Sequence, residues 1–224
     1  MPSHAISYLE RLFLFHEGTI MKLFKFSKMH GAGNDFIVVD NTTAHLRFSA
    51  ESVVKLCDRR RGVGADGLIL LSKSCVPGCD NITMEFFNCD GSKAELCGNG
   101  LRCAAMFAFQ HSMTRNPTPL FITGGGELHA RVLSDNTVRI ELPLTEPFER
   151  LDGVEEHTVY HGVVGVPHLV LRMDDLRNCD ILPLGRRLRN SKAFQPDGTN
   201  GNFISFDSAF KNPVEIRTFE RGVE

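Results

Sequence analysis

Apolar and polar residues alternate in many short stretches of the chain, and this period of two is typical of β-strands with one buried face. Glycine, asparagine and proline stand between these stretches, where turns are expected. The first two predicted strands flank a glycine turn, and three later ones form a meander. The predicted strands are residues 22–26, 36–40, 67–71, 82–87, 121–123, 127–133, 137–142, 157–164, 168–172, 203–206 and 214–219.

Two segments have the pattern of helices. Residues 49–57 begin with Ser49, a residue type suited to capping a short helix. Residues 101–109 consist largely of Leu, Ala, Met and Phe without β-branched side chains, which predicts a buried helix. Together with the strands, which we expect to be mostly antiparallel, these helices indicate a mixed α/β (α+β) fold.

A proline-rich joint at residues 143–147 separates two parts of the chain. A length of 224 residues allows one large domain or two small ones. We place the boundary near Thr145, with a first domain at residues 21–145 and a second at residues 146–224. Because Met21 looks like a second possible start, residues 1–20 are interpreted as an N-terminal extension outside both domains.

The charge balance argues against a nucleic-acid or membrane partner. Lys and Arg number 25 and Asp and Glu 27, which gives a formal net charge of −2 at pH 7. No apolar run approaches the roughly 18 residues needed to cross a bilayer. Residues 12–15 are apolar but too few for a signal peptide, and charged residues flank them. We therefore expect a small-molecule partner.

The seven cysteines are an odd number, and no secretory signal accompanies them. Free thiols in a reducing cytoplasm are a better interpretation than a disulfide framework, and most of them are expected to be buried. A metal site would have to combine Cys75 and Cys79 with Cys89 or Cys97. That spacing differs from the usual pair two residues apart, and no histidine lies close by, so we expect no metal.

One cysteine stands in a distinctive setting. Cys97, Gly98, Asn99 and Gly100 follow a polar turn and open the predicted buried helix. The partial positive charge of a helix N-terminus favours a thiolate, and the N–H groups of the first turn can hold a carboxylate. The two glycines leave room for that approach. A thiolate beside a carboxylate-binding site is suited to removing the α-proton of an amino acid.

Five motifs, in order along the chain, give this setting a wider context. Their order and spacing resemble those of the diaminopimelate epimerase family from about Met21 to Glu224. Proline racemases look similar around the cysteine but carry His where this chain has Asn99, and phenazine-biosynthesis-type isomerases lack the paired thiols. The motifs are His30-Gly-Ala-Gly-Asn-Asp-Phe36, Gly62-Val-Gly-Ala-Asp-Gly67, Phe87-Asn-Cys-Asp-Gly-Ser92, Cys97-Gly-Asn-Gly100 and Phe219-Glu-Arg-Gly222.

The resemblance implies a fold and a reaction. The fold is two pseudo-symmetric domains, each a curled, mostly antiparallel sheet around a central helix, with the active site between them. The reaction converts LL-diaminopimelate to its meso form for lysine and peptidoglycan synthesis, without pyridoxal phosphate, metal or other cofactor. One cysteine takes the α-proton and a second delivers a proton to the opposite face; Cys97 matches the first. A homodimer is compatible with this interpretation.

The resemblance also implies the residues that hold the substrate. Gly98 and Asn99 match positions that receive the α-carboxylate. On sequence alone the asparagines would be read as turn residues and the charged positions as surface residues. Asp66 is interpreted as a structural turn residue. The remaining substrate-binding matches are Asn34, Asn88, Asn200, Glu220 and Arg221.

Two departures from the family pattern affect what we expect. Some members have a substrate-contacting asparagine where this chain has Val166, which removes a polar contact for the distal end of the substrate. His168, two residues later, is interpreted as structural. The segment from Phe219 echoes the one around Asn88, which lies nine residues before Cys97. By that echo a second Cys-Gly would fall about nine residues after Glu220, beyond the end of the chain.

We therefore expect the second domain to be incomplete and the chain by itself to be a poor epimerase. Two alternatives remain open at this stage. One is a non-catalytic protein that keeps an amino-acid site. The other is a related racemase or isomerase with the same fold.

Overall fold

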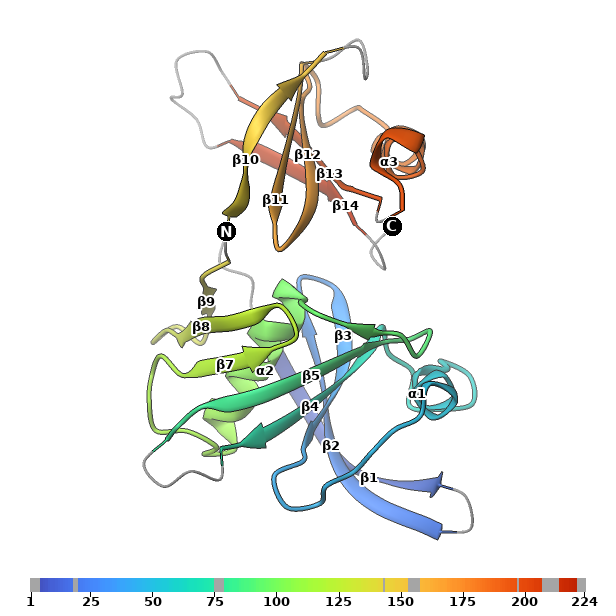
Figure 1. Cartoon of the computed structure of the whole chain (residues 1–224), viewed down its shortest axis with the longest axis vertical. Coiled ribbons are helices and arrows are strands. Elements are labelled where there is room, and N and C mark those ends of the chain that lie inside the picture. The colour runs from blue at the N-terminus through green and yellow to red at the C-terminus, as the bar shows by residue number, and fades with distance from the viewer. Residues whose placement is uncertain are drawn as a thin grey trace. The chain divides into compact units, whose positions relative to one another are not determined.

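A computed structural model describes residues 5–17, 20–74, 79–142, 144–152, 158–196, 198–206 and 214–220. The chain divides into two compact units, Met1–Glu141 and Leu142–Glu224. This division lies a few residues before Thr145, where the sequence placed the domain boundary. Each unit has its own sheet, and each is described by itself below (Figure 1).

The first unit is built on one long, mostly antiparallel sheet. Its strands follow the order β1-β2-β3-β4-β5-β7-β8-β9, and β6 pairs with β5. The pairs β3 with β4 and β5 with β7 are parallel. The elements are β1 (Ala5–Glu17), β2 (Ile20–Gly31), β3 (Asn34–Asp40), α1 (Ala50–Cys57), β4 (Gly67–Lys73), β5 (Ile82–Asn88), β6 (Lys93–Ala94), α2 (Gly98–Gln110), β7 (Leu120–Thr123), β8 (Gly126–Val132) and β9 (Val138–Ile140).

The segment interpreted as an extension contributes to this sheet. Strand β1 pairs antiparallel with β2 from Ala5↔Gly31 to Glu17↔Ile20. The placement of residues 1–20 outside the fold is therefore wrong for the described part of that segment. The alternation in residues 22–26 marked only part of β2, because the strand continues in both directions along its two neighbours.

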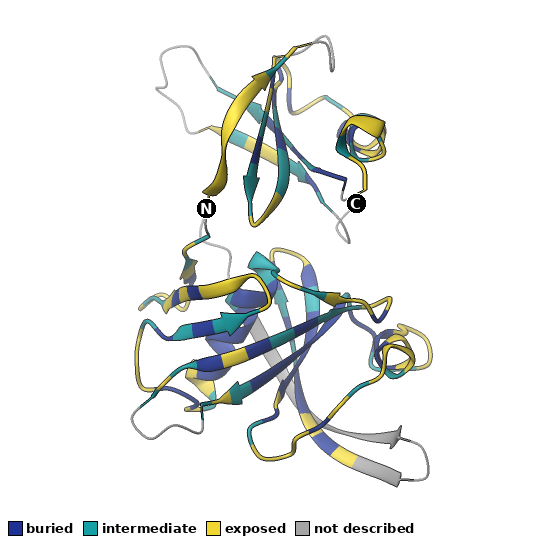
Figure 2. Cartoon of the chain, in the orientation of Figure 1, coloured by how far each residue is buried: buried dark blue, intermediate teal, exposed yellow. Residues whose placement is uncertain are grey.

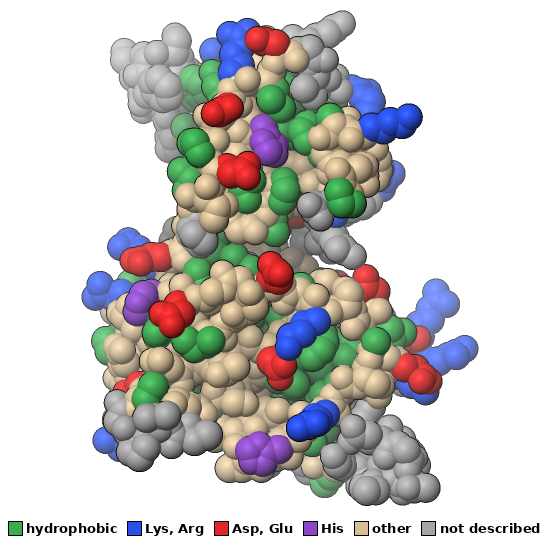
Figure 3. All heavy atoms as spheres, viewed as in Figure 1, with side chains coloured by type: hydrophobic (Ala, Val, Ile, Leu, Met, Phe, Trp, Pro, Cys, Tyr) green, Lys and Arg blue, Asp and Glu red, His purple; other side chains and the backbone are tan. Residues whose placement is uncertain are grey.

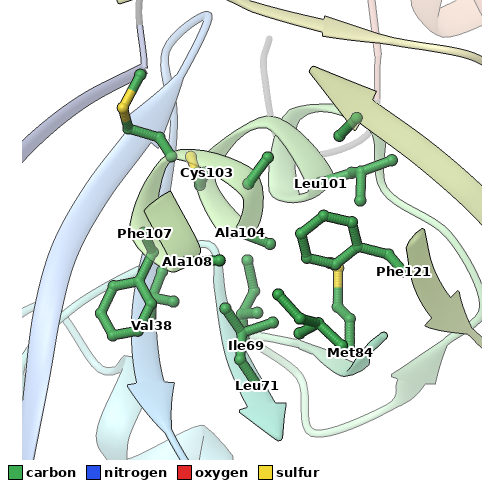
Figure 4. Packing of buried hydrophobic residues seen from close by; sticks show 14 of the residues in the cluster. Val38, Ile69, Leu71, Met84, Leu101, Cys103, Ala104, Phe107, Ala108 and Phe121 are labelled. Atoms are coloured by element: carbon green, nitrogen blue, oxygen red, sulfur yellow. The ribbon is translucent and has the colours of Figure 1, made fainter. Parts of the chain in front are cut away.

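Helix α2 lies within the curve of the sheet and forms the centre of the main core (Figure 1). Every residue from Leu101 to Ala108 is buried except Arg102, so the helix is apolar almost all round, as its composition predicted. Figure 4 shows Phe121 and Met84 lying against the face of α2 that carries Leu101 and Ala104. The buried positions continue along β3 and β4 (Figure 2).

Helix α1 covers the opposite face of the sheet. Ser49 is its N-cap, and the Ser49 hydroxyl accepts a hydrogen bond from the backbone N–H of Ser52, which confirms the predicted start. The buried side chains of α1, Val53 and Leu56 among them, pack with residues of β2, β3 and β4 in a second apolar cluster. The first sheet is thus a middle layer between two helices.

The second unit has a five-stranded sheet in the order β10-β11-β12-β13-β14. Its first strand occupies most of the proline-rich joint predicted at residues 143–147. That prediction is wrong from residue 144 onward, because Pro147 is accommodated at the edge of the sheet, where the ladder to β11 is irregular. The elements are β10 (Leu144–Leu151), β11 (Val159–Val164), β12 (Val166–Arg172), α3 (Ile181–Arg189), η1 (Lys192–Phe194), β13 (Asn200–Ser205) and β14 (Glu215–Phe219).

Helix α3 is the longest helix that the sequence did not predict. Pro183 and Gly185 interrupt its pattern, and both residue types ordinarily weaken a helix. Pro183 is tolerated because it lies in the first turn of the helix. A backbone N–H at that position has no acceptor within the helix, so its absence in proline costs no intrahelical hydrogen bond. Gly185 is required by packing: a Cβ there would lie 2.4 Å from Cγ of Phe219. Tertiary contact thus outweighs the local preference.

The second unit repeats the strand pairing of the first. Each unit contains an antiparallel hairpin, a helix, a strand parallel to the second hairpin strand, and a further strand antiparallel to that one. These elements are β2-β3-α1-β4-β5 in the first unit and β11-β12-α3-β13-β14 in the second. On the face that each helix covers, the ladder Ile37↔Leu68↔Phe87 corresponds to Leu169↔Gly201↔Phe219. The pseudo-symmetry implied by the family resemblance is therefore present in the backbone.

This correspondence gives equivalent positions in the two units. The pair Leu68↔Phe87 in the first unit corresponds to Gly201↔Phe219 in the second. The adjoining positions also correspond, so Asn200 is equivalent to Gly67 and Glu220 to Asn88. The echo between Asn88 and Glu220 that was seen in the sequence follows the same register. Counting back along the hairpins, Val166 takes the place of Asn34.

The surface carries both signs of charge. Figure 3 shows acidic and basic side chains interspersed on the face in view, in keeping with a net charge near zero. Within the described ranges, no helix has the length and apolar character needed to cross a membrane.

Candidate active site

Cys97 is the N-cap of the buried helix α2. Its backbone is extended, with φ −139° and ψ 112°, and its carbonyl accepts the first intrahelical hydrogen bond, from Leu101 N at 2.8 Å. The Cys97 Sγ accepts from the backbone N–H of Gly100 at 3.3 Å. The N–H groups of Gly98 and Asn99 are in the first turn and have no acceptor within the helix. The part-buried thiol therefore lies at a helix N-terminus, beside N–H groups that have no acceptor within the helix.

The first turn of α2 is closely packed against its neighbours. A Cβ on Gly100 would lie 3.3 Å from Ile69 Cδ1, so the first turn rests directly on β4. A Cβ on Gly31 would lie 2.8 Å from the Asn99 carbonyl oxygen, so the tip of the β2–β3 hairpin touches the same turn. The hairpin turn itself needs positive φ at Ala32 (52°) and Gly33 (95°). The predicted helix, which started at residue 101, is thus extended back to Gly98.

A chain of hydrogen bonds joins this hairpin to the helix. The Asn34 amide nitrogen donates to Asp66 Oδ2 at 3.0 Å. The Asn99 amide nitrogen donates to Asn34 Oδ1 at 3.2 Å, and Arg102 Nη1 donates to Asn99 Oδ1 at 3.0 Å. Asn34 is buried, with 7% of its surface exposed. The structure thus brings Asn34 and Asn99 together beside Cys97.

A charged cluster lies at one end of this chain. Arg59 donates to both carboxylate oxygens of Asp35, at 2.7 and 3.0 Å, and to Asp66 Oδ1 at 2.7 Å. Lys28 donates to Asp35 Oδ2 at 2.6 Å and also to the Gly64 carbonyl. Burial raises the pKa of Asp35, but its hydrogen bonds with Arg59 and Lys28 outweigh this and hold the pKa well below the usual range. Asp35 is therefore ionised throughout the ordinary pH range.

Replacing Asp35 by asparagine should destabilise the first unit by about 1–2 kcal/mol at about pH 7, because Arg59 and Lys28 lose a charged acceptor and one of its two oxygens in a partly solvated site. The pKa of Asp35 is lower in the folded than in the unfolded chain, so its contribution is complete above about pH 4 and is lost as the pH falls further. Urea unfolding should therefore show that the difference between the two proteins shrinks toward about pH 2. Asp80→Asn, at an exposed position, is the control. If the difference in free energy of unfolding between the two proteins did not depend on pH, the lowered pKa of Asp35 would be contradicted.

Asn88 lies at the end of β5, opposite Gly67 of β4. Its amide nitrogen donates to Ser92 Oγ at 2.9 Å, and its backbone N–H donates to the Ser92 carbonyl at 2.9 Å. The ladder places the start of β3, the start of β4 and the end of β5 at one end of the sheet. Asn34 and Asn88 are thus at the same sheet end, and Asn34 contacts the start of α2.

The other described thiols have different surroundings. Cys57 and Cys103 are buried, and burial raises the pKa of each thiol to about 12, so both are poor nucleophiles near neutral pH. Cys79 and Cys179 are part-buried, and Cys89 is exposed in the turn after β5. Cys97 differs from all of these in capping a helix.

The remaining predicted residues belong to the second unit. Asn200 is the first residue of β13, and Glu220 directly follows β14. Arg221 lies outside the described residues. Val166 is the first residue of β12 and is 40% exposed. Burial lowers the pKa of His168, whose Nδ1 is 3.0 Å from the amide nitrogen of Asn202, an arrangement that fits the structural role predicted for it.

Asp66 is the residue whose connection the sequence did not show. It was interpreted as a turn residue, whereas the structure also makes it the acceptor for Asn34. Its position in the Gly62–Gly67 motif was a signal that it had more than a local role. Among the described His, Cys, Asp and Glu side chains, there is no group of three arranged to hold a metal ion. Cys75, part of the metal alternative, lies outside the described residues.

Comparison with known proteins gives consistent matches to one family. The family model for diaminopimelate epimerase matches residues 26–143. Over 213 residues the chain is 40% identical to a diaminopimelate epimerase of Aquifex aeolicus (strain VF5), with 89% of this chain and 75% of that protein covered. A second diaminopimelate epimerase, from Hydrogenobaculum sp. (strain Y04AAS1), is 36% identical over 212 residues, with 88% and 75% covered.

A solved structure supports the fold independently. A phenazine biosynthesis protein of the PhzF family from Bacillus anthracis matches with a TM-score of 0.62 at 16% identity, over 98% of this chain and 72% of that one. Fold and sequence together define an isomerase of the epimerase class. The chain belongs to the diaminopimelate epimerase family.

Proposed function

We propose that this protein acts in the conversion of LL-diaminopimelate to meso-diaminopimelate and that Cys97 is the group that exchanges the α-proton. The observation that carries the proposal is the thiol at the N-terminus of α2, next to N–H groups that have no acceptor within the helix. A helix N-terminus stabilises a thiolate and also attracts a carboxylate, so both reactants are favoured at one place.

The proposed step begins with the α-carboxylate of the substrate on the N–H groups of Gly98 and Asn99. The Cys97 thiolate takes the α-proton, and the electron pair of the broken C–H bond remains on the α-carbon as a carbanion, next to the carboxylate. Protonation on the opposite face gives the inverted centre, whereas return of a proton from Cys97 restores the original one. Cys97 serves one face only, so inversion also requires an acid on the other face.

The other substrate contacts are proposed from the family motifs. Asn34 and Asn88 lie at the sheet end described above. In the second unit, Asn200, Glu220 and Arg221 match the family's substrate-binding positions. The pseudo-symmetric position of Asn34 is occupied by Val166, so the second unit lacks one amide that the first provides. We propose that recognition of the distal amino-acid end differs from that of relatives with asparagine there.

The proposed setting is a reducing one. The cysteines described by the structure are all free thiols. A catalytic thiolate has to stay reduced to accept a proton, which agrees with a cytoplasmic enzyme.

Limiting iodoacetamide near neutral pH tests the role of Cys97 without requiring turnover. We expect Cys97 to be alkylated faster than the exposed Cys89, because its thiolate form is stabilised, and LL-diaminopimelate to protect Cys97 but not Cys89. Peptide mapping by mass spectrometry measures both rates in the same molecule. Labelling of Cys97 that is no faster than that of Cys89 and unaffected by diaminopimelate would contradict the proposal. Protection without α-proton exchange would indicate a binding protein instead.

A further inference from the structure

The hydrogen bonds around Asn34 and Asn99 run in one direction. Asp66 carries only acceptors when ionised, and Arg102 carries only donors. Between them, Asn34 donates to Asp66 and accepts from Asn99, while Asn99 in turn accepts from Arg102. Every bond of this series therefore has its donor on the Arg102 side and its acceptor on the Asp66 side.

From this geometry we infer that Asp66 and Arg102 are positioning residues that fix the orientation of the Asn34 and Asn99 amides. An isolated asparagine can exchange its oxygen and nitrogen by a half-turn about its last side-chain bond. Here a half-turn of Asn34 would place its oxygen against the Asp66 carboxylate. A half-turn of Asn99 would place its NH₂ group against the Arg102 guanidinium. A charge at each end excludes both rotations.

The surroundings keep both ends of the series in place. Asp66 Oδ2, the oxygen that accepts from Asn34, also accepts from the backbone N–H of Asp35 at 3.1 Å, and this second bond does not involve Arg59. The backbone donor therefore fixes the position of this oxygen. Arg102 lies three residues after Asn99 on α2, on the same face of the helix, so the second end is held by the helix itself.

The fixed orientation has a consequence for ligand recognition that depends on the proposed function. Each amide uses one hydrogen of its NH₂ group within the series, and one hydrogen on each remains. Together with the backbone N–H groups of Gly98 and Asn99, these hydrogens make the region beside Cys97 rich in donors. Such a region selects an anionic group such as the carboxylate of an amino acid. With the amides reversed, oxygen acceptors would face the same carboxylate and repel it.

The orientation can be measured in the ligand-free protein from the solvent exchange of side-chain NH₂ protons, observed by nitrogen-15 NMR on the 224-residue chain. We expect one proton of each pair on Asn34 and Asn99 to exchange about 10-fold or more slowly than its partner. Asp66→Asn and Arg102→Met should each abolish this asymmetry at both asparagines, and Arg102→Lys should retain it. Arg59→Gln is the matched control, because it removes an ion pair to Asp66 but no bond of the series.

Several outcomes would overturn the inference. One is an effect of Asp66→Asn on Asn34 alone combined with an effect of Arg102→Met on Asn99 alone, because the bonds would then be independent. Another is an equal effect of Arg59→Gln, because the cause would then be the charged cluster. If Asp66→Asn does not fold, Arg102→Met applies the same test from the other end.

Calorimetric titration with LL-diaminopimelate separates this inference from the proposed function. We expect Asp66→Asn and Arg102→Met to weaken binding by about 10-fold and Arg59→Gln to bind like the unchanged protein. Failure of the unchanged protein to bind would contradict the proposed function, and the inference would then be judged on the exchange data alone. Normal binding by variants that have lost the exchange asymmetry would overturn the link between orientation and recognition.

Discussion

Replacing Cys97 by serine should reduce the exchange of the α-proton of LL-diaminopimelate with solvent by about 10²–10⁴-fold or more, because a positioned acid–base group is lost. A hydroxyl has nearly the shape of the thiol and can still accept from the Gly100 N–H, so the fold should be retained. A hydroxyl is far less acidic than a thiol and is not ionised near neutral pH, even at a helix N-terminus. Proton NMR in deuterated water measures the loss of the α-proton signal directly.

The appropriate control is Cys89→Ser, which changes an exposed thiol eight residues earlier and should leave the exchange rate unchanged. Exchange and inversion should be followed separately, since deuterium in the LL isomer reports on Cys97 and formation of the meso isomer reports on both faces. Exchange that continues at the same rate in Cys97→Ser would show that another group takes the proton.

Replacing Phe121 by alanine should lower the free energy of unfolding of the first unit by about 3–5 kcal/mol. Phe121 is fully buried and packs into the apolar cluster around α2, beside Leu101, Ala104 and Met84 (Figure 4). Removal of the ring loses its transfer free energy and leaves a cavity that the surrounding helix and strands cannot fill by a small shift. Urea unfolding followed by circular dichroism measures the difference.

Phe109→Ala provides a matched control of the same residue type. Phe109 lies on the last turn of α2 and is 52% exposed, so its loss should change the free energy of unfolding by less than about 0.5–1 kcal/mol. Similar losses for the two variants would show that α2 is not at the centre of the core. Because the two units have separate sheets, fluorescence or NMR signals from each should be followed individually.

Local pattern was sufficient for most elements of both units. The N-cap at Ser49, the buried helix after Cys97 and the strands of the meander depend on residues within a few positions of one another, and such patterns have a fixed period. The sequence did not predict helix α3, because Pro183 and Gly185 disfavour a helix. It did not predict strand β10, because Pro147 disfavours a strand. Contacts such as Gly185 against Phe219 outweigh these local preferences in the folded chain.

The sequence by itself determined the family, through the order and spacing of its motifs, and it indicated the candidate thiol and its place at the start of a helix, through residues adjacent in the chain. The tertiary structure alone decided how Asn34 is held. Its partners Asp66 and Asn99 are 32 and 65 residues away, and they meet it only because β3 pairs with β4 and because Gly31 lets the hairpin approach α2. Strand register and close backbone packing bring distant side chains within hydrogen-bonding distance, and neither leaves a periodic signal in the sequence.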